Sequence, residues 1–191
     1  EDYRDKLDAD GVACLQRIHE SASRMDAMIN GMLELSRVSR APVRSEAVNL
    51  SEMAASIAAG LKAAHPARAV EFSIAPELVV TGDPALLRLA LENLLANSWK
   101  FTRKRPAARI EVGGEVQDGR RVIFVRDDGA GFDPDYAGRM FTLFQRFHPE
   151  REFEGLGVGL ALVRAAIERQ GGRVRAIGGV DAGATVYIHL E

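Results

Sequence analysis

The stretch that decides the fold is ENLLANSWK, residues 92–100. Its leucines fit one side of a helix, and Asn93, Asn97 and Lys100 follow one another at intervals of four and three residues. Because a helix makes one turn in about 3.6 residues, these polar side chains share a face. Amide oxygens suit a hard cation such as Mg²⁺, and an ammonium suits a phosphate. The segment predicts a helix with a ligand-binding face, although a merely solvated polar face has the same pattern.

A second informative stretch is VRDDGAGF, residues 125–132, which predicts a strand that ends in a glycine-containing turn. Gly129 and Gly131 allow the backbone to approach a flat ligand, and a carboxylate such as Asp127 at the strand end can accept a hydrogen bond from an exocyclic amine. An acidic turn that binds nothing has the same composition. Taken alone, this stretch leaves both interpretations open.

The third stretch is EGLGVGL, residues 154–160, which places Gly155, Gly157 and Gly159 at the start of a helix. Unpaired N–H groups and the positive end of the helix dipole bind anions at such a terminus. The pattern is not the dinucleotide-binding fingerprint, because that requires G-x-G-x-x-G after a strand and position 160 is leucine. Glycines that only permit close helix packing are the alternative.

The rest of the chain predicts a sheet with helices on one face. Asn49 followed by Glu52 is a capping box, and Asp83 followed by Pro84 is a helix start. Helices are expected from Asn49 to 64, over 83–101 and over 156–170, and strands over 70–74, 78–81, 109–116, 120–125, 173–177 and 184–190, with 126–154 as a loop. This pattern favours a two-layer α/β sandwich with a mixed, mostly antiparallel sheet.

One long helix is predicted over residues 10–39. Its apolar residues recur at heptad spacing, which favours contact with a partner helix over a helix that lies on its own domain. They are Leu15, Ile18, Ala22, Met25, Ile29 and Met32. Pro42 ends the helix, so the expected domains are residues 1–40 and 41–191. The chain starts without methionine in the middle of a pattern, and we expect it to be a piece of a longer protein.

Composition excludes several classes of protein. The 191 residues are 47% hydrophobic and 27% charged, which suits a folded domain. The 25 basic and 27 acidic residues give a net charge of −2, so a nucleic-acid partner is not expected. A single cysteine, Cys14, forms no internal disulfide, and no apolar run is long enough to span a bilayer. A cytoplasmic location is expected.

The order of the three stretches resembles the catalytic, ATP-binding domain of bacterial sensor histidine kinases, within the superfamily of gyrase, Hsp90 and MutL. The resemblance covers residues 45–191. Its five motifs are an N box at 93–100, a first glycine box at 127–131, an aromatic F box at 140–147, a second glycine box at 155–159 and a closing box at 183–185. The stretch FQRFHPEREFEGLGVGLALV further resembles the kinase modules of bacterial phytochromes.

The resemblance implies a role for each matching residue, with ATP and Mg²⁺ as cofactors. Asp127 would accept the adenine amino group with support from Thr185, and Asn97 with Asn93 would hold Mg²⁺. Lys100 would face the phosphates. The implied catalytic residues are Asn93, Lys100 and Arg146, with Arg139, His148 and Arg151 as alternatives to Arg146. The implied cofactor-binding residues are Asn97, Asp127, Gly129, Gly131, Gly155, Gly157, Gly159 and Thr185.

Two residues depart from the family pattern. Asp128 stands where asparagine is usual, and Leu156 replaces the usual threonine or serine next to the phosphates. Residues 132–153 also hold five of the eight phenylalanines. So many aromatic side chains are expected to fold over bound nucleotide and to dock on a helix. They are Phe132, Phe141, Phe144, Phe147 and Phe153.

Phosphoryl transfer is favoured over hydrolysis by Asn93. Hydrolysing relatives carry a water-activating glutamate at this position, whereas an asparagine cannot act as a general base. Glu92 is turned by about 100° from that face. The resemblance implies that residues 10–39 are the second helix of a dimerisation hairpin. The phosphate-accepting histidine of the family lies on the first helix and should therefore precede residue 1. His19 is not expected to replace it, because the acceptor motif is absent around it.

The resemblance also implies partners: a response regulator, a homodimer through the N-terminal helix, and a membrane only if the sensor region of the whole protein is membrane-bound. Three alternatives are weighed against the kinase. They are a degenerate nucleotide-binding or docking module without kinase activity, an ATP hydrolase of the same fold, and a serine kinase acting on an anti-sigma partner. The long N-terminal helix disfavours the last.

Overall fold

The computed structural model describes residues 8–40, 42–145, 147, 152–153 and 155–190. The sheet order is β2-β4-β5-β7-β6. Its strands are β2 (Val70–Ile74), β4 (Ala108–Gln117), β5 (Arg120–Asp127), β6 (Arg173–Gly178) and β7 (Ala184–His189). Only β2 and β4 pair in parallel among these strands. The predicted mixed, mostly antiparallel sheet is therefore confirmed.

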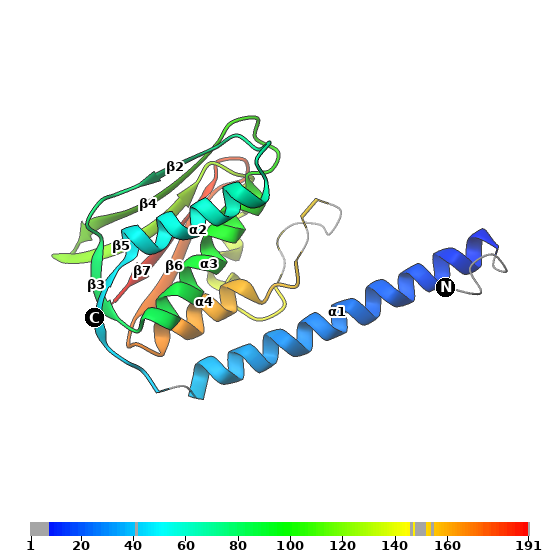
Figure 1. Cartoon of the computed structure of the whole chain (residues 1–191), viewed down its shortest axis with the longest axis horizontal. Helices are drawn as coiled ribbons and strands as arrows, with labels where there is room; N and C mark the ends of the chain where they lie inside the picture. Colours follow the sequence, from blue (N-terminus) through cyan, green and yellow to red (C-terminus); the bar gives the residue numbers. More distant parts are fainter. Residues whose placement is uncertain (1–7, 41, 146, 148–151, 154, 191) are drawn as a thin grey trace.

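Helices α2 (Leu50–Ala64), α3 (Pro84–Phe101) and α4 (Gly159–Glu168) cover one face of the sheet, with α3 between the other two (Figure 1). Four leucines of α3 are almost fully buried in one cluster with inward-facing residues of β4, β5 and β7, such as Ile110, Ile123 and Ile188. They are Leu87, Leu91, Leu94 and Leu95. This layer forms the main core. The predicted two-layer α/β sandwich is confirmed, and its central helix is the one that carries Asn93 and Asn97.

The predicted helix starts have the expected geometry. The Asn49 side chain accepts from the N–H groups of Ser51 and Glu52, and its Nδ2 donates to Glu52 Oε1 at 2.7 Å. Asp83 Oδ1 accepts from the N–H groups of Ala85 and Leu86 at the start of α3. These bonds satisfy N–H groups that a helix leaves unpaired. Both helices therefore begin where the sequence predicts.

A small second sheet lies beside the helices. It pairs β1 (Glu46–Asn49) with β3 (Val79–Gly82) in antiparallel orientation. Asp83, directly after β3, also accepts from the N–H of Arg44 and donates its own N–H to Gln170 at the end of α4. Asp83 thus connects the segment before β1 to the start of α3 and to the end of α4.

Two boundaries differ from the sequence prediction. Helix α4 begins at Gly159 and not at Leu156, because Gly155 and Gly157 have backbone φ angles of +139° and +72°, which a right-handed helix excludes. The expected loop at 126–154 also contains the 3₁₀-helix η2 (Pro134–Arg139), which Asp133 caps. Otherwise the elements lie within a few residues of their predicted bounds.

The N-terminal helix α1 (Ala9–Arg40) runs away from the domain, and only its C-terminal part packs on α4 (Figure 1). Gly31 and Val38 are its buried residues. A Cβ added to Gly31 would lie 2.7 Å from Val158 Cγ1. In contrast, the heptad residues Leu15, Ile18, Met25, Ile29 and Met32 are 51–59% exposed. No helix of the described chain is both long and apolar enough to cross a membrane.

Candidate functional site

A cavity of about 350 Å³ lies between α3, the loop after β5 and the loop before α4. Eight of the residues that the sequence predicts for the site line it together. They are Asn93, Asn97, Lys100, Asp127, Gly131, Gly155, Gly157 and Gly159. Segments far apart in the chain thus converge on one pocket, which is the arrangement that their order predicted.

The wall formed by α3 carries the two asparagines. Asn93 Nδ2 donates to the backbone carbonyl of Leu89 at 2.8 Å. Its Oδ1 lies toward Gly159, where an added Cβ would come within 2.8 Å of that oxygen. The same Cβ would lie 3.8 Å from Asn97 Nδ2. Glycine at position 159 therefore allows α4 to begin directly against the amide groups of α3.

The Asp127 carboxylate, at the end of β5, forms another part of the lining and is bonded to α3. Its Oδ2 accepts from Ser98 Oγ at 2.8 Å, and its Oδ1 accepts from the N–H of Gly129 at 3.0 Å. Burial raises the pKa of Asp127, while the hydrogen bonds from Gly129, Ser98 and the Ala184 N–H act in the opposite direction. A largely buried, oriented carboxylate is a specific acceptor for a ligand amine.

Two loops interlock at this end of the cavity. Gly131, with φ of +61°, lies so close to the next loop that an added Cβ would be 1.8 Å from the carbonyl oxygen of Gly179. Asp181 N–H donates to the carbonyl of Ala130 at 2.8 Å. Arg105 joins the same loops by donating from Nε to Asp128 O at 2.8 Å and from Nη2 to Asp181 O at 2.7 Å. At this end of the pocket, the backbone of the loop after β5 is therefore packed closely against the loop between β6 and β7.

The loop before α4 forms the other end. Gly155 lies near Lys100, since an added Cβ would be 3.1 Å from the Lys100 Nζ atom. A Cβ on Gly157 would be 2.4 Å from the carbonyl oxygen of Gln145. No side chain of the described residues caps the start of α4. The first N–H groups of this helix therefore suit an anion next to Lys100.

Comparison with known proteins identifies the family. Residues 82–191 match the model of the histidine kinase-, DNA gyrase B- and HSP90-like ATPases. The chain belongs to this ATPase family. Methanogenesis regulatory histidine kinase FilI of Methanothrix harundinacea is 37% identical over 88% of this chain and 19% of its own length. Cyanobacterial phytochrome A of Nostoc sp. is 31% identical over 98% of this chain and 24% of its own length.

Solved structures agree with this ATPase fold. The mycobacterial sensor histidine kinase MprB has a TM-score of 0.63 at 25% identity and covers 77% of this chain and 97% of its own. Full-length ShkA, solved with AMPPNP, has a TM-score of 0.69 at 24% identity over 96% of this chain and 39% of its own. The chain spans about a quarter or less of the length of the curated relatives given above.

Two residues predicted for the ATPase site do not line it. Gly129 packs against the end of α3 and holds Asp127 through its N–H. Thr185 lies on the other face of the sheet, where its Oγ1 accepts from Arg126 Nε at 3.2 Å. Strand residues alternate between faces, and Asp127 pairs with Ala184, so Ala184 lines the pocket. The assignment of Thr185 beside Asp127 is therefore corrected.

Sequence reasoning missed two residues of the site. Ser98 is 4% exposed and bonds directly to Asp127, but in the sequence it is only the neighbour of Asn97. Arg105 lies in a basic segment that has the composition of a solvated loop. No local pattern marks either residue, because their partners follow later in the chain.

The aromatic segment contributes to several parts of the structure. Phe132, Phe147 and Phe153 line the pocket. Phe153 contacts Phe101 with ring centroids 5.1 Å apart, and Phe147 contacts Tyr136 at 5.3 Å. The other two phenylalanines of the cluster pack elsewhere: Phe141 in the main core and Phe144 against the cluster between α1 and α4.

The cations expected near the phosphates are only partly described. Arg146, His148 and Arg151 lie outside the described residues. Arg139, the remaining alternative, ends η2 and has its guanidinium 5.1 Å from the Tyr136 ring centroid. Lys100 is therefore the cation that the structure places at the pocket.

The two departures from the family pattern have structural roles. Asp128 lies outside the pocket lining, and its Oδ1 accepts from the N–H of Arg109 at 3.0 Å. Leu156 lines the pocket and packs with the cluster of Val38, Val158 and Leu162, which joins α1 to α4. In place of the hydroxyl usual in the family, Leu156 adds an apolar side chain to this cluster.

Proposed function

We propose that this chain is the ATP-binding catalytic region of a two-component sensor histidine kinase. The protein would transfer the γ-phosphoryl group of ATP to a histidine that precedes this segment, and then to an aspartate of a response regulator. One observation carries the proposal. The Asp127 carboxylate, the polar face of α3 and the glycine-rich start of α4 line the same cavity. Relatives of this chain include FilI, a regulatory histidine kinase, and the sensor histidine kinase CpxA of Escherichia coli, which is 32% identical over 85% of this chain and 36% of its own length.

ATP fits the chemistry of the two ends of the pocket. Asp127 can accept the hydrogen bond of the adenine amino group, and Lys100 with the start of α4 can hold the phosphates. The AMPPNP complex of ShkA, a protein with the same fold, supports a nucleotide as the ligand. Gly155, Gly157 and Gly159 would frame the phosphates, with Gly131 near the base.

Mg²⁺ fits the side-chain amides of Asn93 and Asn97, which lie toward the start of α4 and can offer their oxygens as ligands. When bound, Mg²⁺ supplies positive charge that neutralises the phosphates. Because asparagine side chains are uncharged, they would not reduce the net positive charge that Mg²⁺ presents to the phosphates.

Transfer to an imidazole is favoured over hydrolysis because the described side chains nearest Gly155 and Gly159 are a lysine and two asparagines, none of which is a carboxylate base. Among the described lining residues Asp127 is the sole acidic one, and its carboxylate already accepts hydrogen bonds from Ser98 and Gly129. Glu92 is half exposed and pairs with Arg88 at 3.7 Å, away from the cavity. In the transfer step, the bond from the γ-phosphorus to the ADP oxygen breaks while a phosphorus–nitrogen bond to imidazole forms. The imidazole N–H proton leaves to solvent.

The partners follow from the same proposal. The exposed heptad residues of α1 would pair with a second copy in a homodimer, as a helical seam does in water. The ATPase domain would act in the cytoplasm and pass its phosphoryl group to a response regulator. A membrane would be involved only through other regions of the whole protein.

The test uses purified fragment and a longer protein that includes the upstream helix. We expect the fragment to bind MgATP in calorimetry and to incorporate no label from γ-labelled ATP, whereas the longer protein gains an acid-labile, base-stable phosphate. Asn97→Ala should abolish that labelling. Steady phosphate release by the fragment would favour a hydrolase, and absence of ATP binding would favour a docking module.

A further inference from the structure

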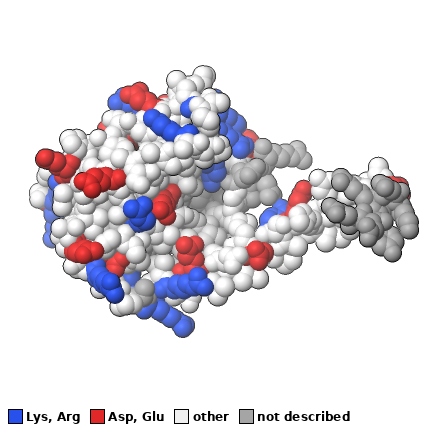
Figure 2. All heavy atoms as spheres, in the orientation of Figure 1, with Lys and Arg blue, Asp and Glu red and all other residues white. Residues whose placement is uncertain are grey.

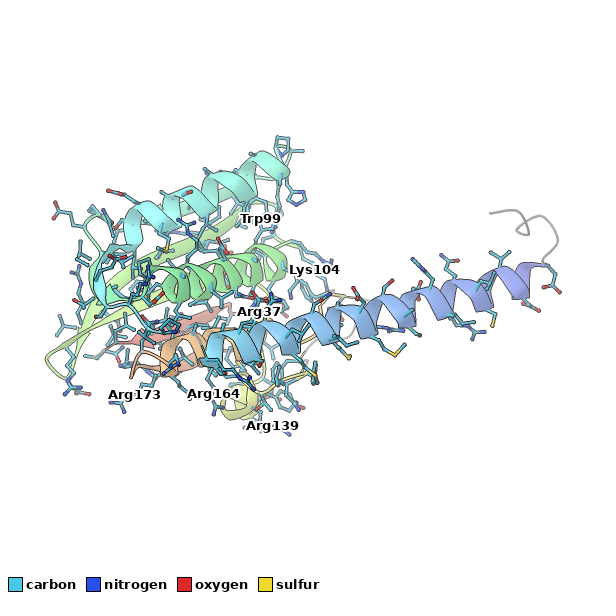
Figure 3. All side chains as sticks on the ribbon, turned by 60° about the horizontal axis from the view of Figure 1, so that its bottom comes forward. Arg37, Trp99, Lys104, Arg139, Arg164 and Arg173 are labelled. Carbon is cyan, nitrogen blue, oxygen red and sulfur yellow. The ribbon has the colours of Figure 1, made fainter. Side chains whose placement is uncertain are left out.

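A second hollow lies beside the phosphate end of the pocket, where α2 and α3 end. It is open to solvent, has a volume of about 770 Å³ and is lined by His65, Arg68, Trp99, Lys100 and Arg103 together with small apolar side chains. Lys100 lines both cavities. Figure 3 labels Trp99 and Lys104 at this end of the domain. The hollow lined by these residues is called the α2–α3 hollow below.

The wall of this hollow is built on Trp99. The indole is 7% exposed and stacks with His65 and Phe72 at centroid distances of 6.0 and 6.1 Å. The Arg68 guanidinium lies 4.5 Å from the indole centroid. Arg68 also donates to Trp99 O and, at 2.8 Å, to Thr102 Oγ1. These contacts fix the guanidinium in place.

Arg68 and Arg103 give the α2–α3 hollow a cationic lining. None of its described lining residues is acidic, and in the described chain no carboxylate lies within ion-pair distance of Arg68 or Arg103. Burial lowers the pKa of Arg68, with no carboxylate to oppose it. Figure 2 shows Lys and Arg side chains on this end of the domain. Two guanidinium groups without a carboxylate partner among the described residues, Arg68 and Arg103, favour an external anion.

We propose that the α2–α3 hollow docks a carboxylate-rich segment of the protein that presents the phosphate-accepting imidazole. Lys100 links the hollow to the glycine loop, because it lines both cavities and a Cβ added to Gly155 would lie 3.1 Å from its Nζ. A segment held at Arg68 and Arg103 is therefore next to the phosphate end of the pocket. The open, shallow shape suits a peptide surface. This inference rests on the proposed kinase function.

Trp99 allows a direct test, because it is the one tryptophan of the chain. The probe is a short peptide of alternating Glu and Ala, and the neutral control is the matching peptide of Gln and Ala. We expect the acidic peptide to change Trp99 fluorescence saturably, with an affinity that falls as salt is added. Arg103→Glu should weaken binding at least tenfold. Arg173→Glu on β6 makes the same charge change elsewhere and should leave binding unchanged.

Several outcomes would overturn the inference: equal binding of the neutral peptide, an equal loss in Arg173→Glu, or inorganic pyrophosphate that binds the hollow more tightly than the peptide. If Arg103→Glu unfolds, His65→Glu at an exposed position tests the same surface. Calorimetry with MgATP on each protein separates the two proposals. ATP binding without peptide binding rejects only the docking surface, and peptide binding without ATP binding rejects the proposed function.

Discussion

The two ends of the ATPase pocket are constructed differently. At the Asp127 end, a strand terminus, a buried serine and two interlocked loops hold one carboxylate in place, and Arg105 joins those loops from outside. At the other end, glycines with positive φ angles and the uncapped start of α4 present backbone N–H groups beside Lys100. A rigid end suits recognition of one flat group by shape and a single hydrogen bond. A backbone loop suits phosphates, which need many donors and positive charge.

The largest effect is expected from Gly131→Ala at the rigid end. An alanine at φ of +61° is strained by about 1–2 kcal/mol, and its Cβ would overlap the Gly179 carbonyl. We expect the free energy of unfolding to fall by more than about 3 kcal/mol. Gly119→Ala is the matched control, because φ is +75° and nothing lies within 4 Å of an added Cβ. Chemical denaturation measures both, and equal losses would contradict the interlocked arrangement.

The next effect concerns Asp127→Asn. Loss of a charged acceptor should weaken ATP binding by about 1.5–3 kcal/mol, or roughly tenfold to a hundredfold, in calorimetry. Stability should respond differently. Burial raises the pKa of Asp127 above its ordinary 3.8, so over the range between these values the folded state holds a proton that the unfolded chain has lost. Wild-type stability should therefore fall as pH rises through that range.

The Asp127→Asn protein lacks this titration, so its stability should not show that decrease. Denaturation at a series of pH values gives the comparison. The same pH slope in both proteins would mean that another group is responsible, and undiminished ATP affinity would reject Asp127 as the base-recognising residue.

A smaller effect is expected from Gly157→Ala at the loop end. The positive φ of +72° and the contact with Gln145 O strain the alanine, but the loop can shift more easily than the interlocked end. We expect ATP affinity to fall by about 1–2 kcal/mol while adenosine affinity stays unchanged. Calorimetry with both ligands tests this. Equal losses for ATP and adenosine would show that the two ends are not independent.

The smallest expected effect is a loss of ATP affinity that should occur when the Ser98 hydroxyl is removed but not when the Thr185 hydroxyl is removed. Ser98→Ala removes the hydroxyl that donates to Asp127 and should weaken ATP binding by about 1 kcal/mol, roughly fivefold. Thr185→Val removes a hydroxyl on the opposite face of the sheet and should leave ATP binding unchanged. If Thr185→Val weakened binding as much as Ser98→Ala, the role first expected for Thr185 would be restored.

Much of the site is already determined by local sequence. Helical spacing alone places Asn93, Asn97 and Lys100 on one face, and the capping residues Asn49 and Asp83 mark where helices begin. Short-range geometry is sufficient for these features, because each depends on residues within one or two helical turns.

Tertiary structure decided what depends on strand register and loop contact. The pairing of Asp127 with Ala184 turns Thr185 away from the pocket, and the packing of α3 on β5 brings Ser98 to Asp127. Likewise, the heptad pattern of α1 extends from Leu15 to Met32, yet the buried residues of the helix are Gly31 and Val38, and Met25 is exposed. The periodicity of a helix or strand shows which residues share a face, but what that face meets is fixed by side chains that are distant in sequence.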